Sequence, residues 1–184
     1  MTFNEKADLI KAQCLKETGT DPIAIAIRLM AIPDISIHGP EHHMLDGSAF
    51  LTAYKNAGGQ IDLVSALDEL EKRSSFMPGA TCGYWGVCGS AASLGSALAI
   101  IHGTGPLSNN EFYKDNLHLT SRCLNKIGDL GGPRCCKRNA YLSITEATAF
   151  VKEKYGIEMK IAPFKCPYYP KNPTCLGKKC PFHP

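Results

Sequence analysis

The chain has 184 residues, of which 44% are hydrophobic and 20% charged, and its net charge is +3. Such a chain can form one domain with a hydrophobic core of its own, so it does not need disulfides as a small secreted scaffold does. A charge of +3 is too small to indicate nucleic-acid binding by itself. The longest apolar run, near residues 94–101, is too short to cross a bilayer, which excludes a membrane-spanning protein.

No secretory signal is visible, because charged residues interrupt the apolar residues of the segment 2–16. We therefore expect a cytoplasmic protein with reduced thiols. The chain contains nine cysteines, and an odd number cannot all pair into disulfides. Reduced and clustered cysteines point to metal ligands or catalytic groups.

The first half of the chain predicts four helices: one that begins after Thr2, one over 23–32, one from Pro40 to about 56 and one over 62–73. Thr2 and Glu5 form a capping box. Asp21 followed by Pro22 predicts an N-cap with proline at the first helical position.

The second half predicts three more helices, over about 89–102, 108–127 and 143–155, of which the last two begin at the capping boxes of Ser108 and Ser143. Gly95 lowers the stability of the first of these, so we expect another backbone, or a second subunit in a homo-oligomer, to approach it closely. Residues 157–162 alternate and predict one short strand. The predicted fold is a compact, mainly α-helical domain over 1–162, with a cysteine-rich metal-binding tail over 163–184 packed on it.

The tail has no hydrophobic periodicity and must be ordered by something other than apolar burial. Its spacing, Cys166-x8-Cys175-x4-Cys180-x2-His183, supplies the four ligands of a tetrahedral zinc site. Proline follows two of the cysteines, as it does after iron–sulfur ligands, so three thiolates and an outside ligand could hold a [4Fe–4S] cluster equally well. Unpaired surface thiols on a floppy tail are the remaining alternative.

Four more cysteines lie in glycine-rich segments. Cys82 and Cys88 have glycines between and after them, and Cys88 precedes the predicted helix over 89–102, whose positive end favours a thiolate. Cys135 and Cys136 follow Gly-Gly-Pro beside basic residues, which should lower their pKa. We expect Cys82, Cys88 and Cys135 to bind a cofactor and Cys136 to be a nucleophile. A small buried residue is the alternative for Cys88, and Cys14 and Cys123 are most simply core residues.

The segment from His38 to Asp46 is rich in histidine. Pro40 places His42 and His43 in the first helical turn, and Asp46, four residues after His42, can hold that imidazole in one tautomer. We predict that His42 or His43 carries a proton in catalysis. A polar helix start that faces solvent is the alternative.

The strings HGPEHH, GATCGYWGVCGSA, HGTGPLS and GGPRCCKRNAYL resemble an uncharacterised family of cysteine-rich domains. That family occurs in anaerobic bacteria and archaea and is sometimes joined to a SAM-dependent methyltransferase. The resemblance covers most of the chain, from about Ile37 to the tail. An anaerobic setting would suit an oxygen-sensitive cluster, but without a methyltransferase domain the association implies no reaction for this chain.

The sequence therefore predicts a cytoplasmic metalloprotein with an iron–sulfur centre and reactive thiols, for sulfur transfer or desulfuration of a small molecule or a modified nucleotide. The alternative is a zinc knuckle that binds RNA or another protein without catalysis, with Tyr168 and Tyr169 stacking on bases. A thiol–disulfide carrier is a third possibility, but neither cysteine pair has the Cys-x-x-Cys spacing of thioredoxin-like proteins.

Overall fold

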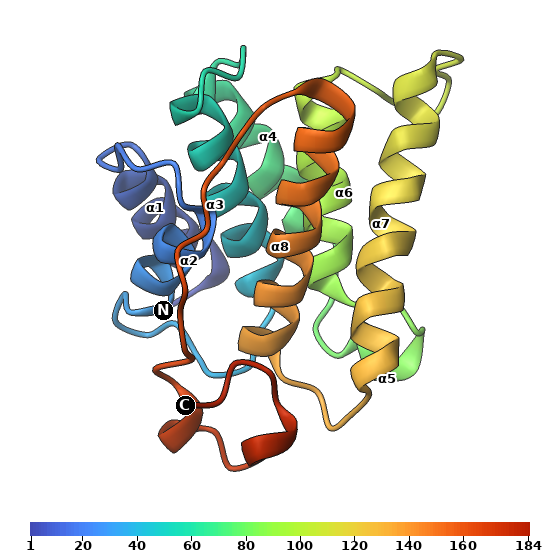
Figure 1. Ribbon diagram of the computed structural model, residues 1–184. Coiled ribbons are helices and arrows are strands. Elements are labelled where there is room, and N and C mark those ends of the chain that lie inside the picture. Colours follow the sequence, from blue (N-terminus) through green and yellow to red (C-terminus); the bar gives the residue numbers. More distant parts are fainter.

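The computed structural model describes all 184 residues and contains eight α-helices, two short 3-10 turns and no strand. The α-helices are α1 (Phe3–Cys14), α2 (Pro22–Met30), α3 (His42–Asn56), α4 (Leu63–Ser75), α5 (Thr81–Tyr84), α6 (Gly89–Ile101), α7 (Glu111–Leu130) and α8 (Cys136–Tyr155). The 3-10 turns η1 (Tyr169–Lys171) and η2 (Gly177–Lys179) lie in the tail. The helical prediction is thus confirmed (Figure 1).

The predicted starts of α1 and α2 are confirmed at the level of single hydrogen bonds. The Glu5 backbone N–H donates to the Thr2 hydroxyl and the Thr2 N–H donates to the Glu5 carboxylate, which completes the capping box. Asp21 accepts hydrogen bonds from the N–H groups of Ile23 and Ala24, with Pro22 at the first helical position. Local chemistry decides where these two helices begin.

The predicted starts of the last two helices are wrong. Helix α7 begins after Asn110, whose side chain accepts from the Tyr113 N–H, while the Ser108 hydroxyl accepts from Gly105 in the preceding turn. Helix α8 begins at Cys136, where the preceding Gly-Gly-Pro segment also predicts a helix start, so that Ser143 is a buried interior residue. A serine three residues before a glutamate fits a helix interior as well as a helix start.

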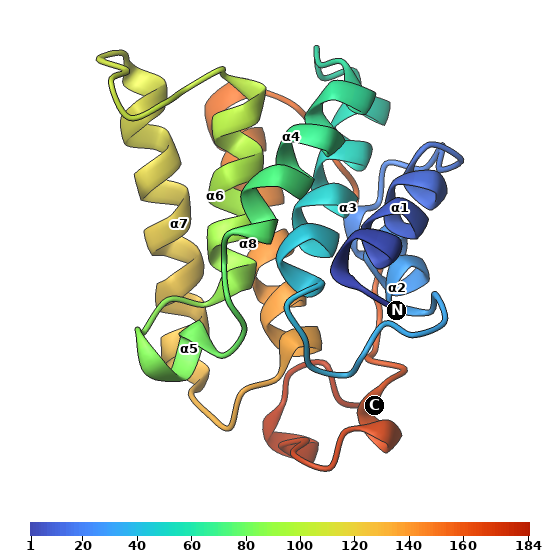
Figure 2. The ribbon, with the colours of Figure 1, turned by 180° about the vertical axis from the view of Figure 1, so that it is seen from behind.

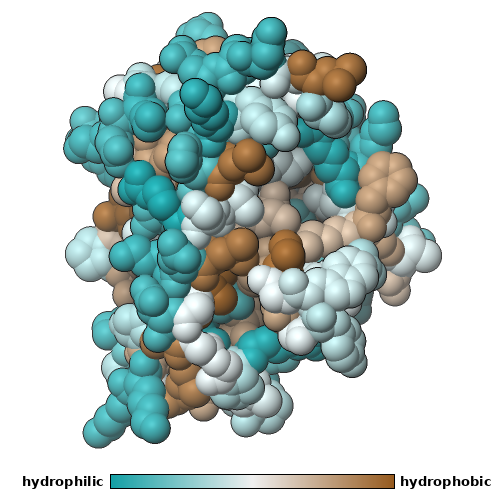
Figure 3. Space-filling model, turned by 90° about the vertical axis from the view of Figure 1, so that its right-hand side faces the viewer, coloured by the Kyte–Doolittle hydropathy of each residue, from teal (hydrophilic) through white to brown (hydrophobic).

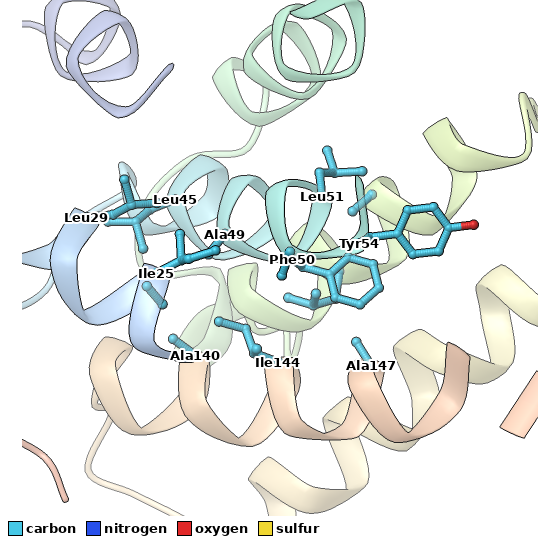
Figure 4. Packing of buried hydrophobic residues seen from close by; sticks show 14 of the residues in the cluster. Ile25, Leu29, Leu45, Ala49, Phe50, Leu51, Tyr54, Ala140, Ile144 and Ala147 are labelled. Carbon is cyan, nitrogen blue, oxygen red and sulfur yellow. The ribbon is translucent and has the colours of Figure 1, made fainter. Parts of the chain in front are cut away.

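Helix α3 is the centre of the fold and packs against α1, α2, α4, α6 and α8. Every residue from His42 to Tyr54 is buried, which explains why this helix carries few charges. Figure 4 shows its Leu45 beside Leu29 of α2, and its Phe50 facing the apolar side chains of α8. The burial of this helix on all sides fixes its polar first turn inside the protein.

Gly95 of α6 lies where the sequence predicts a close approach. A side chain there would overlap the Thr120 hydroxyl and meet the Asn116 side chain, both from α7 of the same chain. The neighbour is therefore a helix within the domain, which approaches Gly95 through its side chains.

The predicted strand over 157–162 is absent. This segment is extended but no other strand lies beside it, and it crosses the outside of the bundle next to α2 and α3 (Figure 1). The Asp21 carboxylate accepts a hydrogen bond from the Ala162 N–H, and Met159 is buried in the main core. The tail that follows is anchored by the Tyr168 hydroxyl, which donates to the Ile27 carbonyl.

Helices α3, α6 and α8 begin at the same end of the molecule, where α5 and the tail also lie (Figures 1 and 2). Their positive N-terminal ends therefore gather beside the cysteine-rich segments. No helix is long and apolar enough to span a bilayer. Seen from the side of α7, the surface mixes polar side chains with exposed apolar ones (Figure 3).

Candidate functional site

The neighbours Cys135 and Cys136 belong to two different sites. Cys135 is the N-cap of α8 and Cys136 is its first residue, so the turn of the helix directs their side chains apart. Cys135 lines a cavity together with the three tail cysteines, Cys166, Cys175 and Cys180, which we term the cysteine cavity. Cys136 lines a second cavity, the thiol–histidine pocket, with Cys82, Cys88, His38, His42, His43 and Asp46.

The cysteine cavity directs N–H groups at its sulfur atoms. The Asn172 side-chain amide lies 3.3 Å from the Cys135 sulfur, and the Arg138 backbone N–H lies 3.4 Å from the same atom. The Gly177 N–H lies 3.4 Å from the Cys175 sulfur. Hydrogen bonds donated to sulfur favour the thiolate, which is the form that binds metals.

Two buried cations lie beside the cysteine cavity. Lys137 is 1% exposed and Arg138 is 3% exposed, and neither forms an ion pair with a carboxylate within 4 Å. Lys137 instead contacts the Ser36 carbonyl and the His42 ring, while Arg138 donates to the carbonyls of Gly131 and Pro133. Buried cations are rarely left without a negative partner. Both residues line the cysteine cavity, so negative charge on its sulfurs would balance them.

The tail closes around the cavity through a backbone bond and an aromatic cluster. The Cys166 N–H donates to the Phe182 carbonyl at 2.8 Å. The rings of Tyr141, Phe164 and Phe182 pack with centroids 5.1 to 5.3 Å apart. His183, a predicted metal ligand, also lines the cavity, but its Nδ1 contacts the Pro184 carbonyl and its ring packs on Tyr169.

The spacing of the side chains differs from that of a site for one ion. Nowhere in the chain do three His, Cys, Asp or Glu side chains lie close enough together to hold a single metal ion. The cysteine cavity leaves room for about one water-sized group between these side chains.

The thiol–histidine pocket collects sulfur from three elements. Cys82 comes from α5, Cys88 is the N-cap of α6 and Cys136 begins α8. The Asn139 amide donates to the Cys88 sulfur at 3.3 Å. The free space is about 790 Å³, including its opening to solvent, and a second cleft beyond Cys82 and Cys88 shares both cysteines.

From Glu41 to Asp46 the histidine segment is buried against α8 and α1, so it is not a polar helix start facing solvent. Glu41 is 3% exposed and accepts hydrogen bonds from the Ser36 N–H and the Lys6 ammonium. A side chain at Gly39 would overlap the Glu41 carboxylate, so glycine is required there. Burial alone would raise the pKa of Glu41, but these hydrogen bonds outweigh it and lower the pKa to about 2.

His42 and His43 have different environments. The Nε2 atom of His42 lies 3.0 Å from the Lys137 ammonium, and its Nδ1 faces an Asp46 oxygen at 3.6 Å, which is too long for a direct hydrogen bond. His43 Nδ1 contacts the Met77 carbonyl at 3.2 Å and must therefore carry the proton. The Nε2 lone pair of His43 then lies against Gly89, next to Cys88. Burial lowers the pKa of His43, which favours the neutral form of this ring.

Several buried polar atoms in the thiol–histidine pocket lack any hydrogen-bond partner. They are both carboxylate oxygens of Asp46, Nδ1 of His42, the Asn139 amide oxygen and the Thr81 hydroxyl. Asp46 has no exposed surface, and the other three residues are at most 3% exposed. Unsatisfied polar atoms in a roomy pocket indicate a place for a polar ligand or for ordered water.

His38 connects the two sites. Its Nδ1 accepts from the Cys136 N–H at 3.4 Å, and its Nε2 lies 3.2 Å from the Asn172 side-chain oxygen. The Asn172 amide nitrogen in turn donates to the Cys135 sulfur. Asn172 and Asn139 were not predicted from the sequence, since an asparagine carries no distinctive spacing. Lys137 and Arg138 were predicted only as basic neighbours of Cys135 and Cys136, and their burial was not predicted.

The prediction that the pKa values of Cys88, Cys135 and Cys136 are lowered is wrong for the protein without a bound metal or cluster. Burial raises the pKa of Cys88 and of Cys135, and it raises the pKa of Cys136 to about 12. Nearby N–H groups and cations act in the opposite direction but are outweighed. Cys14 and Cys123 lie in the hydrophobic core, as predicted.

No curated protein and no solved structure matches this chain. A family model described only as a family of unknown function, DUF5714, matches residues 10–183, a range that includes both cysteine sites and the histidine segment. The chain belongs to this family.

Proposed function

We propose that this protein is a cytoplasmic iron–sulfur protein in which Cys135, Cys166, Cys175 and Cys180 hold a [4Fe–4S] cluster. In the neighbouring pocket it would transfer or remove sulfur from a small molecule or a modified nucleotide. The observation that carries the proposal is the cysteine cavity, where four cysteines, N–H donors and two unpaired cations surround one space. The anaerobic setting implied by the family resemblance would suit such a cluster.

The separation of the candidate ligands argues against a single zinc ion. Tetrahedral zinc with Zn–S bonds of about 2.3 Å requires sulfur atoms about 3.8 Å apart. No three candidate ligands in the chain approach one another closely enough for a single ion. A [4Fe–4S] core binds each thiolate through a different iron, so its four ligands can be further apart.

Cys135 is a better fourth ligand than His183. The Cys135 sulfur already accepts two N–H hydrogen bonds and lies beside Arg138, whereas the His183 ring is held at the edge by Tyr169 and Pro184. Four thiolates also give the centre a net negative charge, which Lys137 and Arg138 would balance.

The thiol–histidine pocket is the proposed place of reaction. A bound cluster would supply or accept electrons. His43 would move a proton at Nε2, because its Nδ1–H is held by the Met77 carbonyl. Asp46 and Asn139 would bind the N–H groups of a substrate through their unpartnered oxygens.

The zinc-knuckle alternative receives less support. The Tyr168 hydroxyl is bound to Ile27, and its ring lies over the Lys137 ammonium, with the nitrogen 5.0 Å from the ring centre. Tyr168 therefore has a structural role and is not free to stack on an RNA base.

Oxygen-free purification followed by iron, sulfide and zinc analysis tests the proposal. We expect iron, sulfide and visible absorbance in the wild-type protein, and the loss of about four irons per chain in Cys135→Ser. The matched controls are His183→Ala and Cys14→Ala, which changes a core cysteine at the end of α1, and both should retain full iron. Stoichiometric zinc without visible absorbance would overturn the proposal.

A further inference from the structure

We propose that Cys82, Cys88 and Cys136 hold a second [4Fe–4S] cluster, which has one iron without a cysteine ligand, open to substrate. The inference deepens the proposed function and rests on it, because the first cluster would exchange electrons with the second. It replaces the nucleophilic role predicted for Cys136 by a ligand role.

Two of the three thiols lie at the positive ends of long helices. Cys88 caps α6 and Cys136 opens α8, so the dipoles of both helices favour negative charge on these sulfurs. The Asn139 amide adds a direct N–H donor to the Cys88 sulfur. These groups stabilise thiolates and the negative charge of a cluster bound to them.

The size and chemistry of the pocket indicate a cluster with a ligand beside it. Its room for water-sized groups is far larger than that of the cysteine cavity, at about 280 against 20 Å³. Its three cysteines can each bind one iron of a cubane [4Fe–4S] cluster. The fourth iron would then face a pocket whose wall carries the unpartnered oxygens of Asp46 and Asn139.

These buried oxygens are an independent sign of a ligand. Asp46 is fully buried and neither of its oxygens has a hydrogen-bond partner, which is costly for a carboxylate. Both Asp46 and Asn139 can accept hydrogen bonds through these oxygens. The substrate that fits is thus a compound with N–H groups close to a sulfur atom, where the sulfur binds the open iron.

The backbone and one histidine connect the two proposed clusters. Their ligands Cys135 and Cys136 are consecutive residues, which gives a short covalent path for electrons. His38 adds a hydrogen-bonded path, from the Cys136 N–H through its ring and Asn172 to the Cys135 sulfur. Such a path would pass single electrons between the two clusters, with an external one-electron reductant as their source.

Counting iron in single-site variants tests this inference separately from the proposed function. Under oxygen-free reconstitution with iron and sulfide, we expect about eight irons per chain in wild type and in Cys14→Ala. We expect about four in Cys136→Ser, in Cys82→Ser and in Cys135→Ser.

Three other patterns of iron content would each overturn one or both of the proposed clusters. Four irons in wild type that persist in Cys136→Ser and vanish in Cys135→Ser would overturn the second cluster and leave the first. Four irons with the reverse pattern would overturn the first cluster and support the second. The absence of iron from wild type, with circular dichroism showing a folded helical protein, would overturn both.

Discussion

Replacing Gly89 by alanine should disturb the thiol–histidine pocket through His43. A β-carbon at Gly89 would lie 2.8 Å from Cγ of the His43 ring and closer still to Cδ2 and Nε2. The ring is 8% exposed and its other edge is held by the Met77 carbonyl, so it cannot move aside without losing that hydrogen bond.

The expected loss of folding free energy in Gly89→Ala is the sum of three contributions. Overpacking a buried site costs about 1–3 kcal/mol, and a lost hydrogen bond costs about 0.5–1.5 kcal/mol. Alanine regains up to about 1 kcal/mol of helix propensity. We expect Gly89→Ala to lower the free energy of unfolding by about 0.5–4.5 kcal/mol.

Gly128 provides the matched control. It lies within α7, and a β-carbon there would meet nothing within 4 Å, so Gly128→Ala should be neutral or stabilising by up to about 1 kcal/mol. Urea unfolding followed by circular dichroism gives both values. Equal stability of the two variants would refute the packing of His43 on Gly89. Nuclear magnetic resonance titration should also show the His43 pKa rising toward its ordinary value in Gly89→Ala, since the displaced ring becomes hydrated.

Two further predictions concern the supports of the site. The pKa of Glu41 is lowered from 4.5 to about 2, so its contribution is complete above about pH 4.5 and is lost as the pH falls toward 2. Glu41→Gln should therefore cost about 3 kcal/mol at neutral pH and much less near pH 2, and an equal cost at both pH values would contradict this. Asp21→Ala removes the cap of α2 and the bond to Ala162, and should cost about 2 kcal/mol. The control Asp62→Ala removes only a hydrogen bond from the Ser65 N–H and should cost about 1 kcal/mol. Urea denaturation midpoints measure both variants. If Asp62→Ala proved the more destabilised of the two, Asp21 would not anchor the tail segment.

The helical fold could be predicted because local signals specify most of its helices. Thr2 and Asp21 cap their helices through bonds to residues two or three positions away, which a sequence displays directly. Ser108 and Ser143 misled the prediction because the same pattern occurs outside helix starts. The extended segment over 157–162 alternates like a strand, but pairing requires a partner strand and the fold supplies none.

The candidate site could be predicted only in part, because its members come from distant segments. The sequence indicated the importance of the cysteines and of His42 and His43, and the structure places them around two cavities. The sequence could not show that Cys135 lines the cysteine cavity and Cys136 the thiol–histidine pocket, because this depends on the exact residue at which α8 begins. The roles of Lys137 and Arg138 depend on burial without a carboxylate, which only the packing of α8 reveals.

The most direct test of the central claim is crystallography of protein grown without oxygen, with X-ray data on both sides of the iron absorption edge. We predict iron atoms inside the cysteine cavity, located by their anomalous signal and bonded to the sulfurs of Cys135, Cys166, Cys175 and Cys180. An iron-free cavity in such crystals, or a single zinc bound by the tail and His183 with Cys135 unbound, would contradict it.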